Sequence, residues 1–291
     1  MECLRRMSGA IALAGLMVTA GCQPAEPDPA SPLPHASLAY EQPEGAGIVV
    51  LDAGLATEVF AEGAQVEKLT EDLFGWSEGP VWIRDGGYLL FTDVPGNTIH
   101  KWSEEAGLET FLQPSGLVGE DTEGVFREPG ANGLIPGDMP GAILLADHGN
   151  RGIARLDLET KEKTFLATRF DGKRFSSPND LVLAEEGAIY FTDPPYGLRE
   201  LDASPFREMA FNGVYLWRPD EDGGSVRVID DSLTRPNGIV RSPDGGTLYV
   251  AVSDPDAARV YAYTLGADGL AMKRRVFADL TAMVGQDYPG L

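Results

Sequence analysis

The sequence predicts an all-β fold, a β-propeller built from repeated four-stranded sheets, and three observations support it. Gly and Pro, 35 and 21 of 291 residues, are spread along the chain and mark many tight turns. Short apolar runs alternate with these turns, and no helical period of about 10–15 residues comes between them. A similar unit recurs about every 50 residues, a spacing typical of propeller blades. A solenoid or a sandwich is the alternative, but the unit length and the strand count together favour blades.

Four repeated units begin at polar residues. They are EGPVWIRDGGYLLFTD from Glu78, NGLIPGDMPGAILLAD from Asn132, NDLVLAEEGAIYFTD from Asn179 and NGIVRSPDGGTLYVAV from Asn237. Between the units, residues 97–112, 152–167 and 213–229 alternate around a Gly-rich or acidic turn, so each is expected to form two further strands. Each unit then has the four strands that a blade requires.

The residues that open the four units are candidate ligands for a cation. In a propeller the first strand of each blade lines the central channel, so these residues should converge on the axis. One carboxylate and three amides offer only oxygen donors, which suits Ca²⁺ better than Zn²⁺. The three histidines, His35, His100 and His148, are too dispersed for a zinc site. The alternative role for each Asn is to cap a turn.

Two further segments offer candidate substrate-binding residues. His148, in ADHGNRG, heads a loop on the same predicted face and either contacts substrate or bonds within its loop. Asp193 and Tyr196, in DPPYG, follow the inner strand of the third unit and either line a pocket or form a rigid loop. The sequence contains no nucleophile elbow, phosphate-binding loop or dinucleotide fingerprint.

The N-terminal residues predict export. Residues 1–21 combine two arginines, an apolar run and small residues, as a signal peptide does, and VTAGC ends in a lipobox-like Cys22. A lipoprotein anchored through Cys22 and facing the periplasm or cell exterior is favoured over an ordinary cleaved signal. Residues 22–47 are rich in Pro, Ala and acids and predict a flexible tether, followed by a propeller over residues 48–291. The net charge of -22 argues against nucleic acid as a partner.

Several motifs from Trp76 onwards resemble the SMP-30/gluconolactonase/LRE family, especially its bacterial gluconolactonase branch. They are SEGPVW, LLFTDVPGN, LLADHGNRGIARL, DGKRFSSPNDLV, IYFTDPPYGL, FNGVYLW, LTRPNGIVRSPDGGTLYVA and VFADL. The resemblance implies a six-bladed propeller with one divalent metal, usually Ca²⁺, at the channel mouth. It also implies hydrolysis of a small sugar lactone or, in relatives, of a phosphotriester. Carried over motif by motif, it makes Glu78, Asn179 and Asn237 metal ligands and has Asn132 face the substrate.

One residue of the family pattern has no counterpart. Relatives open the fifth unit with Pro-Asp-Gly, whose Asp is a metal ligand and the proposed general base, whereas this sequence ends at Leu291 and Asp287 precedes its Pro-Gly step. The resemblance therefore leaves the catalytic residue unassigned. It implies about four blades, an incomplete ring and a C-terminally truncated chain. A non-catalytic, Ca²⁺-stabilised surface propeller is the alternative function.

Overall fold

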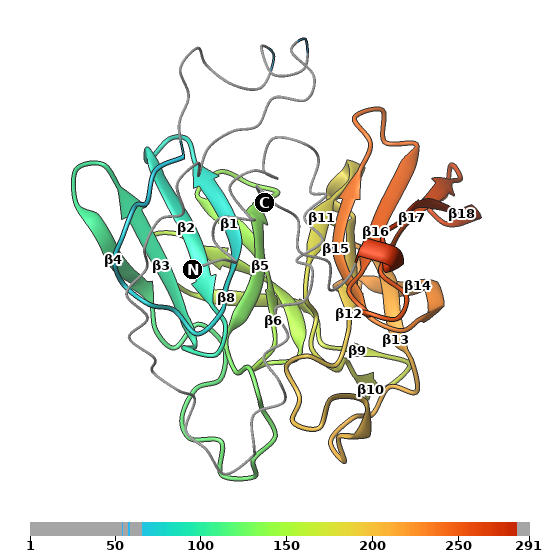
Figure 1. The fold of residues 1–291 in the computed structure, drawn as a ribbon, viewed down its shortest axis with the longest axis horizontal. Coiled ribbons are helices and arrows are strands. Elements are labelled where there is room, and N and C mark those ends of the chain that lie inside the picture. Colours follow the sequence, from blue (N-terminus) through green and yellow to red (C-terminus); the bar gives the residue numbers. More distant parts are fainter. Residues whose placement is uncertain (1–53, 55–57, 59–65, 284–291) are drawn as a thin grey trace.

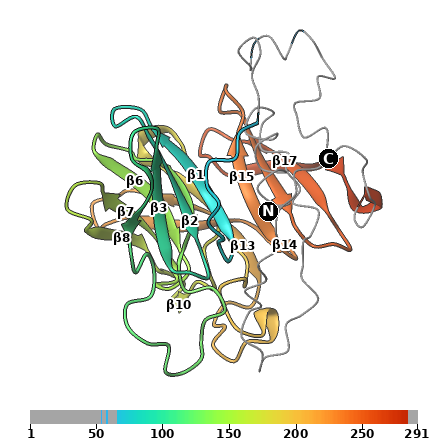
Figure 2. The same cartoon turned by 60° about the vertical axis from the view of Figure 1, so that its left-hand side comes forward.

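The computed structural model describes residues 54, 58 and 66–283. The predicted signal peptide (residues 1–21), the tether (22–47) with its Cys22, and Asp287 lie outside the described residues. The described part consists of four antiparallel four-stranded sheets that follow one another in chain order around an arc (Figure 1 and Figure 2). The prediction of an all-β propeller with four blades is confirmed.

Each sheet keeps its strands in chain order, from an inner to an outer strand. The first comprises β1 (Ser77–Ile83), β2 (Tyr88–Asp93), β3 (Thr98–Ser103) and β4 (Gly107–Leu112). The second comprises β5 (Ala131–Pro136), β6 (Ala142–Asp147), β7 (Gly152–Asp157) and β8 (Lys163–Ala167). The third comprises β11 (Leu181–Leu183), β12 (Ile189–Asp193), β13 (Asn212–Arg218) and β14 (Ser225–Leu233). The fourth comprises β15 (Pro236–Arg241), β16 (Thr247–Val252), β17 (Arg259–Leu265) and β18 (Ala271–Asp279).

The remaining elements are short. A hairpin of β9 (Arg169–Phe170) and β10 (Lys173–Arg174) lies between the second and third sheets in the chain, and sequence reasoning missed it. Three 3₁₀ turns, η1 (Glu185–Gly187), η2 (Leu201–Ala203) and η3 (Thr281–Met283), are the helical segments within residues 66–283. No helix among these residues has the length and apolar character needed to cross a membrane.

The hydrophobic core is divided into three clusters, one between each pair of consecutive sheets. Between the second and third sheets, Phe175, Phe191 and Tyr215 are fully buried and their ring centroids lie 5.1–5.2 Å apart. Burying one such side chain contributes about 1.5–3 kcal/mol. Packing between blades therefore holds the arc together, and it fixes the inner strand of each blade relative to the next.

Three of the four inner strands, β1, β5 and β15, share a local distortion near their first residues. The pairing register shifts between Glu78 and Val81 in β1, and an equivalent shift follows Ala131 in β5 and Pro236 in β15. Such bulges kink a strand and redirect the side chains beside them. The inner strands also pack against one another in the order β1, β5, β11 and β15 (Figure 1). The repeated bulge therefore places corresponding residues at the same end of the first, second and fourth sheets.

Candidate functional site

The structure brings the four strand entrances together. We call Glu78, Asn132, Asn179 and Asn237 the entrance ring. The backbone carbonyl of each Asn accepts a hydrogen bond from the preceding blade: Asn132 from the Thr92 hydroxyl at 3.0 Å, Asn179 from the Gly133 N–H at 2.9 Å, and Asn237 from the Thr192 hydroxyl at 2.7 Å. The blades are thus joined at the backbone of the ring residues, and the ring side chains are left for other contacts.

Glycines next to the ring allow this close approach. A Cβ at Gly79, where φ is +51°, would lie 2.3 Å from the Asn132 carbonyl oxygen. A Cβ at Gly133 would lie 2.8 Å from the Asn179 carbonyl oxygen. No side chain fits at such distances, so contact between blades requires the glycines of the Glu78-Gly79 and Asn132-Gly133 pairs.

Asp180, which sequence reasoning did not single out, replaces glycine at the corresponding place in the third blade. Its two carboxylate oxygens accept hydrogen bonds from the Leu181 N–H at 2.9 Å and from the Ile239 N–H at 3.0 Å. Burial raises its pKa to about 6, although both hydrogen bonds act in the opposite direction. The carboxylate therefore joins two inner strands immediately beside the entrance ring.

Glu78 is the carboxylate of the ring. The indole N–H of Trp76 donates to its Oε1 at 2.8 Å, and no Lys or Arg among the described residues forms an ion pair with it. Burial raises the pKa of Glu78 to about 7, the Trp76 hydrogen bond lowers it, and the nearby charge of Asp180 raises it further. A carboxylate in this environment has a low cost of neutralisation by a proton or a cation.

Asn132 and His148 are brought together, as a pair within the site. The Asn132 Nδ2 lies 3.3 Å from the Nε2 of His148, and the two residues are 4% and 0% exposed. Burial lowers the pKa of His148 to about 3, so the imidazole is neutral at physiological pH. Its Nδ1 lies 3.6 Å from an oxygen of Glu128, a residue that sequence reasoning missed. Burial and Glu78 raise the pKa of Glu128, which reaches about 7 despite the nearby Arg127.

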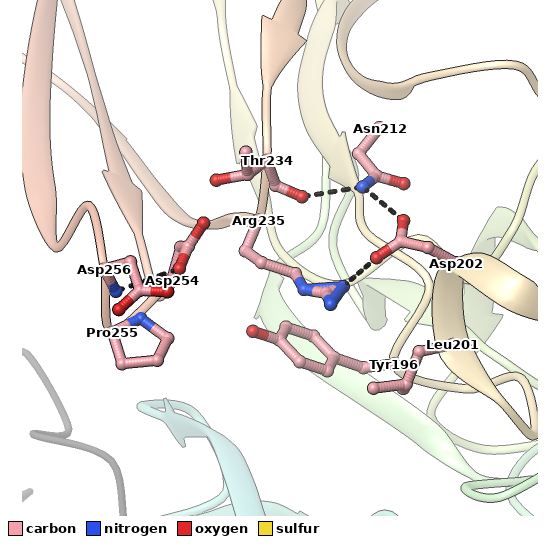
Figure 3. A pocket seen from close by; sticks show the side chains of 9 residues that line it. All are labelled: Tyr196, Leu201, Asp202, Asn212, Thr234, Arg235, Asp254, Pro255 and Asp256. Carbon is pink, nitrogen blue, oxygen red and sulfur yellow. Dashed lines mark hydrogen bonds and ion pairs between the residues drawn. The ribbon is translucent and has the colours of Figure 1, made fainter.

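Tyr196 is connected to Asn237 of the ring through the side chain of Ser253. Its hydroxyl lies 2.6 Å from the Ser253 hydroxyl, which also accepts a hydrogen bond from Asn237 Nδ2 at 3.3 Å. Ser253 was not anticipated from the sequence, because it belongs to a loop 57 residues further along the chain. A pocket of about 480 Å³ lies beside Tyr196, between the third and fourth sheets (Figure 3).

Asp193 has a different environment from the other candidates. It ends β12, the second strand of its sheet, whereas the sequence predicted that it follows an inner strand. It is fully buried, and its two oxygens accept hydrogen bonds from the Ser176 and Ser177 N–H groups at 2.9 and 2.7 Å. Asp93 binds the N–H groups of Gly75 and Trp76 in the same way in the first blade. This geometry makes Asp193 a support for the loop that carries Asn179.

The donor chemistry of the ring is that of a hard-cation site. Its side chains present carboxylate and amide oxygens, which Ca²⁺ and similar ions prefer. The amide of Asn179 makes no hydrogen bond to another described residue, although the residue is only 5% exposed. No group of three or more His, Cys, Asp or Glu residues in the described part is arranged to hold a metal ion.

The fold and this set of side chains define a class of protein: a β-propeller with a carboxylate- and amide-lined site at one end of its inner strands. Residues 76–289 match the family described as SMP-30/Gluconolactonase/LRE-like region. The chain belongs to this family, and the resemblance inferred from its motifs is confirmed.

Individual relatives agree with this assignment. The chain is 43% identical over 225 residues to a gluconolactonase of Zymomonas mobilis subsp. mobilis, a match that covers 77% of this chain and 59% of the relative. The structure of XC5397 from Xanthomonas campestris, a gluconolactonase, superposes with a TM-score of 0.58 and 32% identity over 71% of this chain and 63% of the other. Our chain thus spans less than two thirds of the length of both relatives.

A more distant structure has the same fold. Regucalcin from Agrobacterium tumefaciens strain C58, a calcium-binding protein, superposes with a TM-score of 0.52 and 21% identity. The match covers 74% of this chain and 63% of regucalcin. At this identity the likeness concerns the propeller fold alone.

Proposed function

We propose that this protein hydrolyses a small lactone to its hydroxy acid at the entrance ring. The observation that carries the proposal is the position of Glu78, a half-buried carboxylate with no cationic partner among the described residues, beside the three Asn of the ring. Family membership and the 43% identity to a gluconolactonase support a sugar lactone such as gluconolactone as the substrate.

Glu78, Asn179 and Asn237 are proposed to hold a divalent cation, in the first place Ca²⁺, although another divalent metal suits the same donors. All three offer hard oxygen ligands, and the hydrogen bond from Asn237 Nδ2 to Ser253 leaves its Oδ1 available. When bound, such a cation supplies a Lewis acid for the lactone carbonyl. Two amide ligands neutralise less positive charge than carboxylates would, so the donor set favours a strongly polarising site.

The other residues of the site are proposed to position the substrate. The neutral His148 holds the amide of Asn132, so that the orientation of Asn132 toward a substrate is determined before binding. Tyr196 is held against Ser253 at the edge of the pocket. Asp193 is proposed to act indirectly. Its carboxylate accepts hydrogen bonds from the Ser176 and Ser177 N–H groups and so holds the loop that precedes Asn179.

Proton release from glucono-1,5-lactone tests this function. We expect acid release that requires added Ca²⁺, stops with EDTA and is lost in Glu78→Gln, because the amide removes the only charge of the ring. Glu104→Gln, in an exposed turn, is the matched control and should behave as the unsubstituted protein. Full turnover by Glu78→Gln with metal still bound would contradict the assignment of this residue.

The same assay separates the alternative functions. A non-catalytic, Ca²⁺-stabilised binding module would show a higher melting temperature with Ca²⁺ but no metal-dependent acid release. A phosphotriesterase would turn over a phosphotriester faster than the lactone when the two are compared in parallel. Either outcome would replace the lactonase proposal.

We also propose that the protein is exported and held at the membrane by a lipid on Cys22, facing the periplasm or cell exterior. The support is the sequence pattern VTAGC after an apolar segment, which lies outside the described residues. Cys22→Ala should move the protein from the membrane fraction to the soluble fraction. A soluble unsubstituted protein would contradict the anchor.

A further inference from the structure

The pocket beside Tyr196 is built from four separate segments. They are the loop after β12, the first residue of β13, the junction of β14 with β15, and the loop after β16 (Figure 3). Its lining consists of Tyr196, Leu201, Asp202, Asn212, Thr234, Arg235, Asp254, Pro255 and Asp256. The volume of about 480 Å³ is within the range of small-molecule sites. All but two of these side chains, Leu201 and Pro255, carry a polar group, so the pocket is suited to a hydrophilic ligand.

Arg235 is held in a defined position within this pocket. Its Nη1 donates to Asp202 Oδ2 at 2.5 Å, and its guanidinium lies 5.7 Å from the centre of the Tyr196 ring. Asp202 is itself oriented by Asn212, whose Nδ2 donates to Oδ1 at 2.9 Å. The other guanidinium N–H groups of Arg235 have no hydrogen-bond acceptor among the described residues. Several donors are therefore preorganised and available to a ligand.

Acceptors face Arg235 across the pocket. In Figure 3 the guanidinium of Arg235 points toward Asp202, and Asp254 and Asp256 lie on the opposite side of the pocket. One oxygen of Asp254 accepts from the Asp256 N–H at 3.0 Å, so the second oxygen stays available. A hydroxyl group both donates and accepts, and it can therefore bond to a carboxylate and a guanidinium together. Three carboxylates disfavour an anionic ligand, so the lining favours a neutral polyol.

The pocket is connected to the entrance ring. Tyr196 forms part of the pocket wall, and Asn237 is a member of the ring. The Ser253 hydroxyl forms hydrogen bonds with both residues, so this one side chain connects the pocket wall to the ring. A ligand with a reactive carbonyl at the ring can therefore extend its remaining atoms into the pocket.

We propose that this pocket binds the hydroxyl groups of a neutral sugar lactone, and that Arg235 determines the preference for hydroxylated over unsubstituted lactones. The inference rests on the proposed lactone hydrolysis at the entrance ring. It adds a subsite on the third and fourth blades, formed in part by the loop of Leu201 and Asp202, and it assigns the specificity of the reaction to named side chains.

The test compares two substrates and one inert ligand in Arg235→Met and Arg155→Met. Arg155 is the matched control, because it also pairs with an aspartate, Asp138, and its side chain is exposed to the same 23%. The substrates are glucono-1,5-lactone and δ-valerolactone, which lacks the hydroxyl groups. The inert ligand is glucono-1,5-lactam, whose dissociation constant is measured by calorimetry.

We expect Arg235→Met to weaken lactam binding about tenfold and to lower the ratio of kcat/KM for gluconolactone over valerolactone by a similar factor. Arg155→Met should leave both quantities within twofold. Unchanged lactam binding, or an equal loss on both lactones, would overturn the proposal. Should neither lactone be hydrolysed by the unsubstituted protein, the proposed function fails and lactam binding alone decides the subsite.

A second variant guards against a folding defect in Arg235→Met. Asp254→Asn removes one acceptor from the opposite wall at a part-exposed loop position and keeps the shape of the side chain. It should weaken lactam binding severalfold with an unchanged melting temperature. Lactam binding equal to that of the unsubstituted protein would count against a hydroxyl subsite.

Discussion

The carboxylate of Asp180 accepts a hydrogen bond from the Ile239 N–H at 3.0 Å, and so joins the inner strand of the third blade to that of the fourth. Its second oxygen binds the Leu181 N–H at 2.9 Å. Both donors are backbone groups beside the entrance ring, and a backbone N–H deprived of its acceptor is costly when it is buried. This one side chain therefore links the stability of the blade contact to the geometry of the site.

Asp180→Ala should lower the free energy of unfolding by about 1–3 kcal/mol, because it leaves the N–H groups of Leu181 and Ile239 without their acceptor. Urea denaturation measures the loss. Asp180→Asn keeps one carbonyl acceptor and should lose less. Asp222→Ala, at an exposed turn, is the control and should stay within about 0.5 kcal/mol of the unsubstituted protein. An equally small effect of Asp180→Ala would show that the link is not important for stability.

Gly79→Ala should destabilise the protein more than Gly87→Ala, although φ is positive at both positions, +51° and +62°. A Cβ at Gly79 would meet the Asn132 carbonyl oxygen at 2.3 Å, whereas a Cβ at Gly87 would have nothing within 4 Å. Both variants carry the cost of the left-handed backbone, about 1–2 kcal/mol, and Gly79→Ala adds about 1–3 kcal/mol of steric strain. Equal urea midpoints would contradict the proposed contact between blades.

Glu128→Gln should reduce the loss of stability at high pH. The pKa of Glu128 is 4.5 by itself and about 7 in the folded protein, so between these values the unfolded chain releases a proton that the folded chain retains. Stability due to this group is full below pH 4.5 and is lost as the pH rises through 7. The loss amounts to as much as about 3 kcal/mol, and Gln, which does not titrate, avoids it.

Urea denaturation at pH 5 and pH 8 in EDTA measures this difference. Glu105→Gln, at an exposed turn, should lose stability between the two pH values as the unsubstituted protein does. Parallel pH dependence in Glu128→Gln and the unsubstituted protein would mean that Glu128 is already ionised in the folded state at pH 5.

His148→Leu should lower kcat/KM for a lactone about tenfold, because Asn132 loses the partner that orients its amide. The rise in melting temperature on adding Ca²⁺ should stay unchanged, since His148 is not one of the proposed ligands. His148→Gln offers an amide to Asn132 and should recover part of the activity. A lost Ca²⁺ effect in His148→Leu would show that this residue acts through the metal site instead.

The fold was predictable because its signals are local. Residues 97–112, 152–167 and 213–229 alternate around tight turns, and each forms the two strands expected of it. The β9–β10 hairpin was missed because two-residue strands leave no pattern long enough to recognise. Asn179 lies two residues before the start of β11 rather than within the strand. Its N–H nevertheless donates to the Thr192 carbonyl oxygen at 2.9 Å, so Asn179 keeps the position that the repeat predicted.

Parts of the site left no such signal. Glu128 and Ser253 belong to irregular loops, where no periodicity indicates which way a side chain points. Asp180 follows Asn179 directly, and only the bond to Ile239 in the next blade distinguishes it from an ordinary turn residue. The pocket of Arg235 draws on four segments of the chain, and no single segment predicts it.

From the sequence by itself one obtains four repeated units, their strand order and the polar residue that opens each, because turns and alternation act over a few residues. The chemistry of those residues comes from the assembled blades. Glu78 has a pKa of about 7 and His148 of about 3 because neighbouring blades remove water from around them. Desolvation depends on segments that are distant in the chain. The packing of the blades, rather than the sequence motifs, therefore determines the pKa values of these side chains.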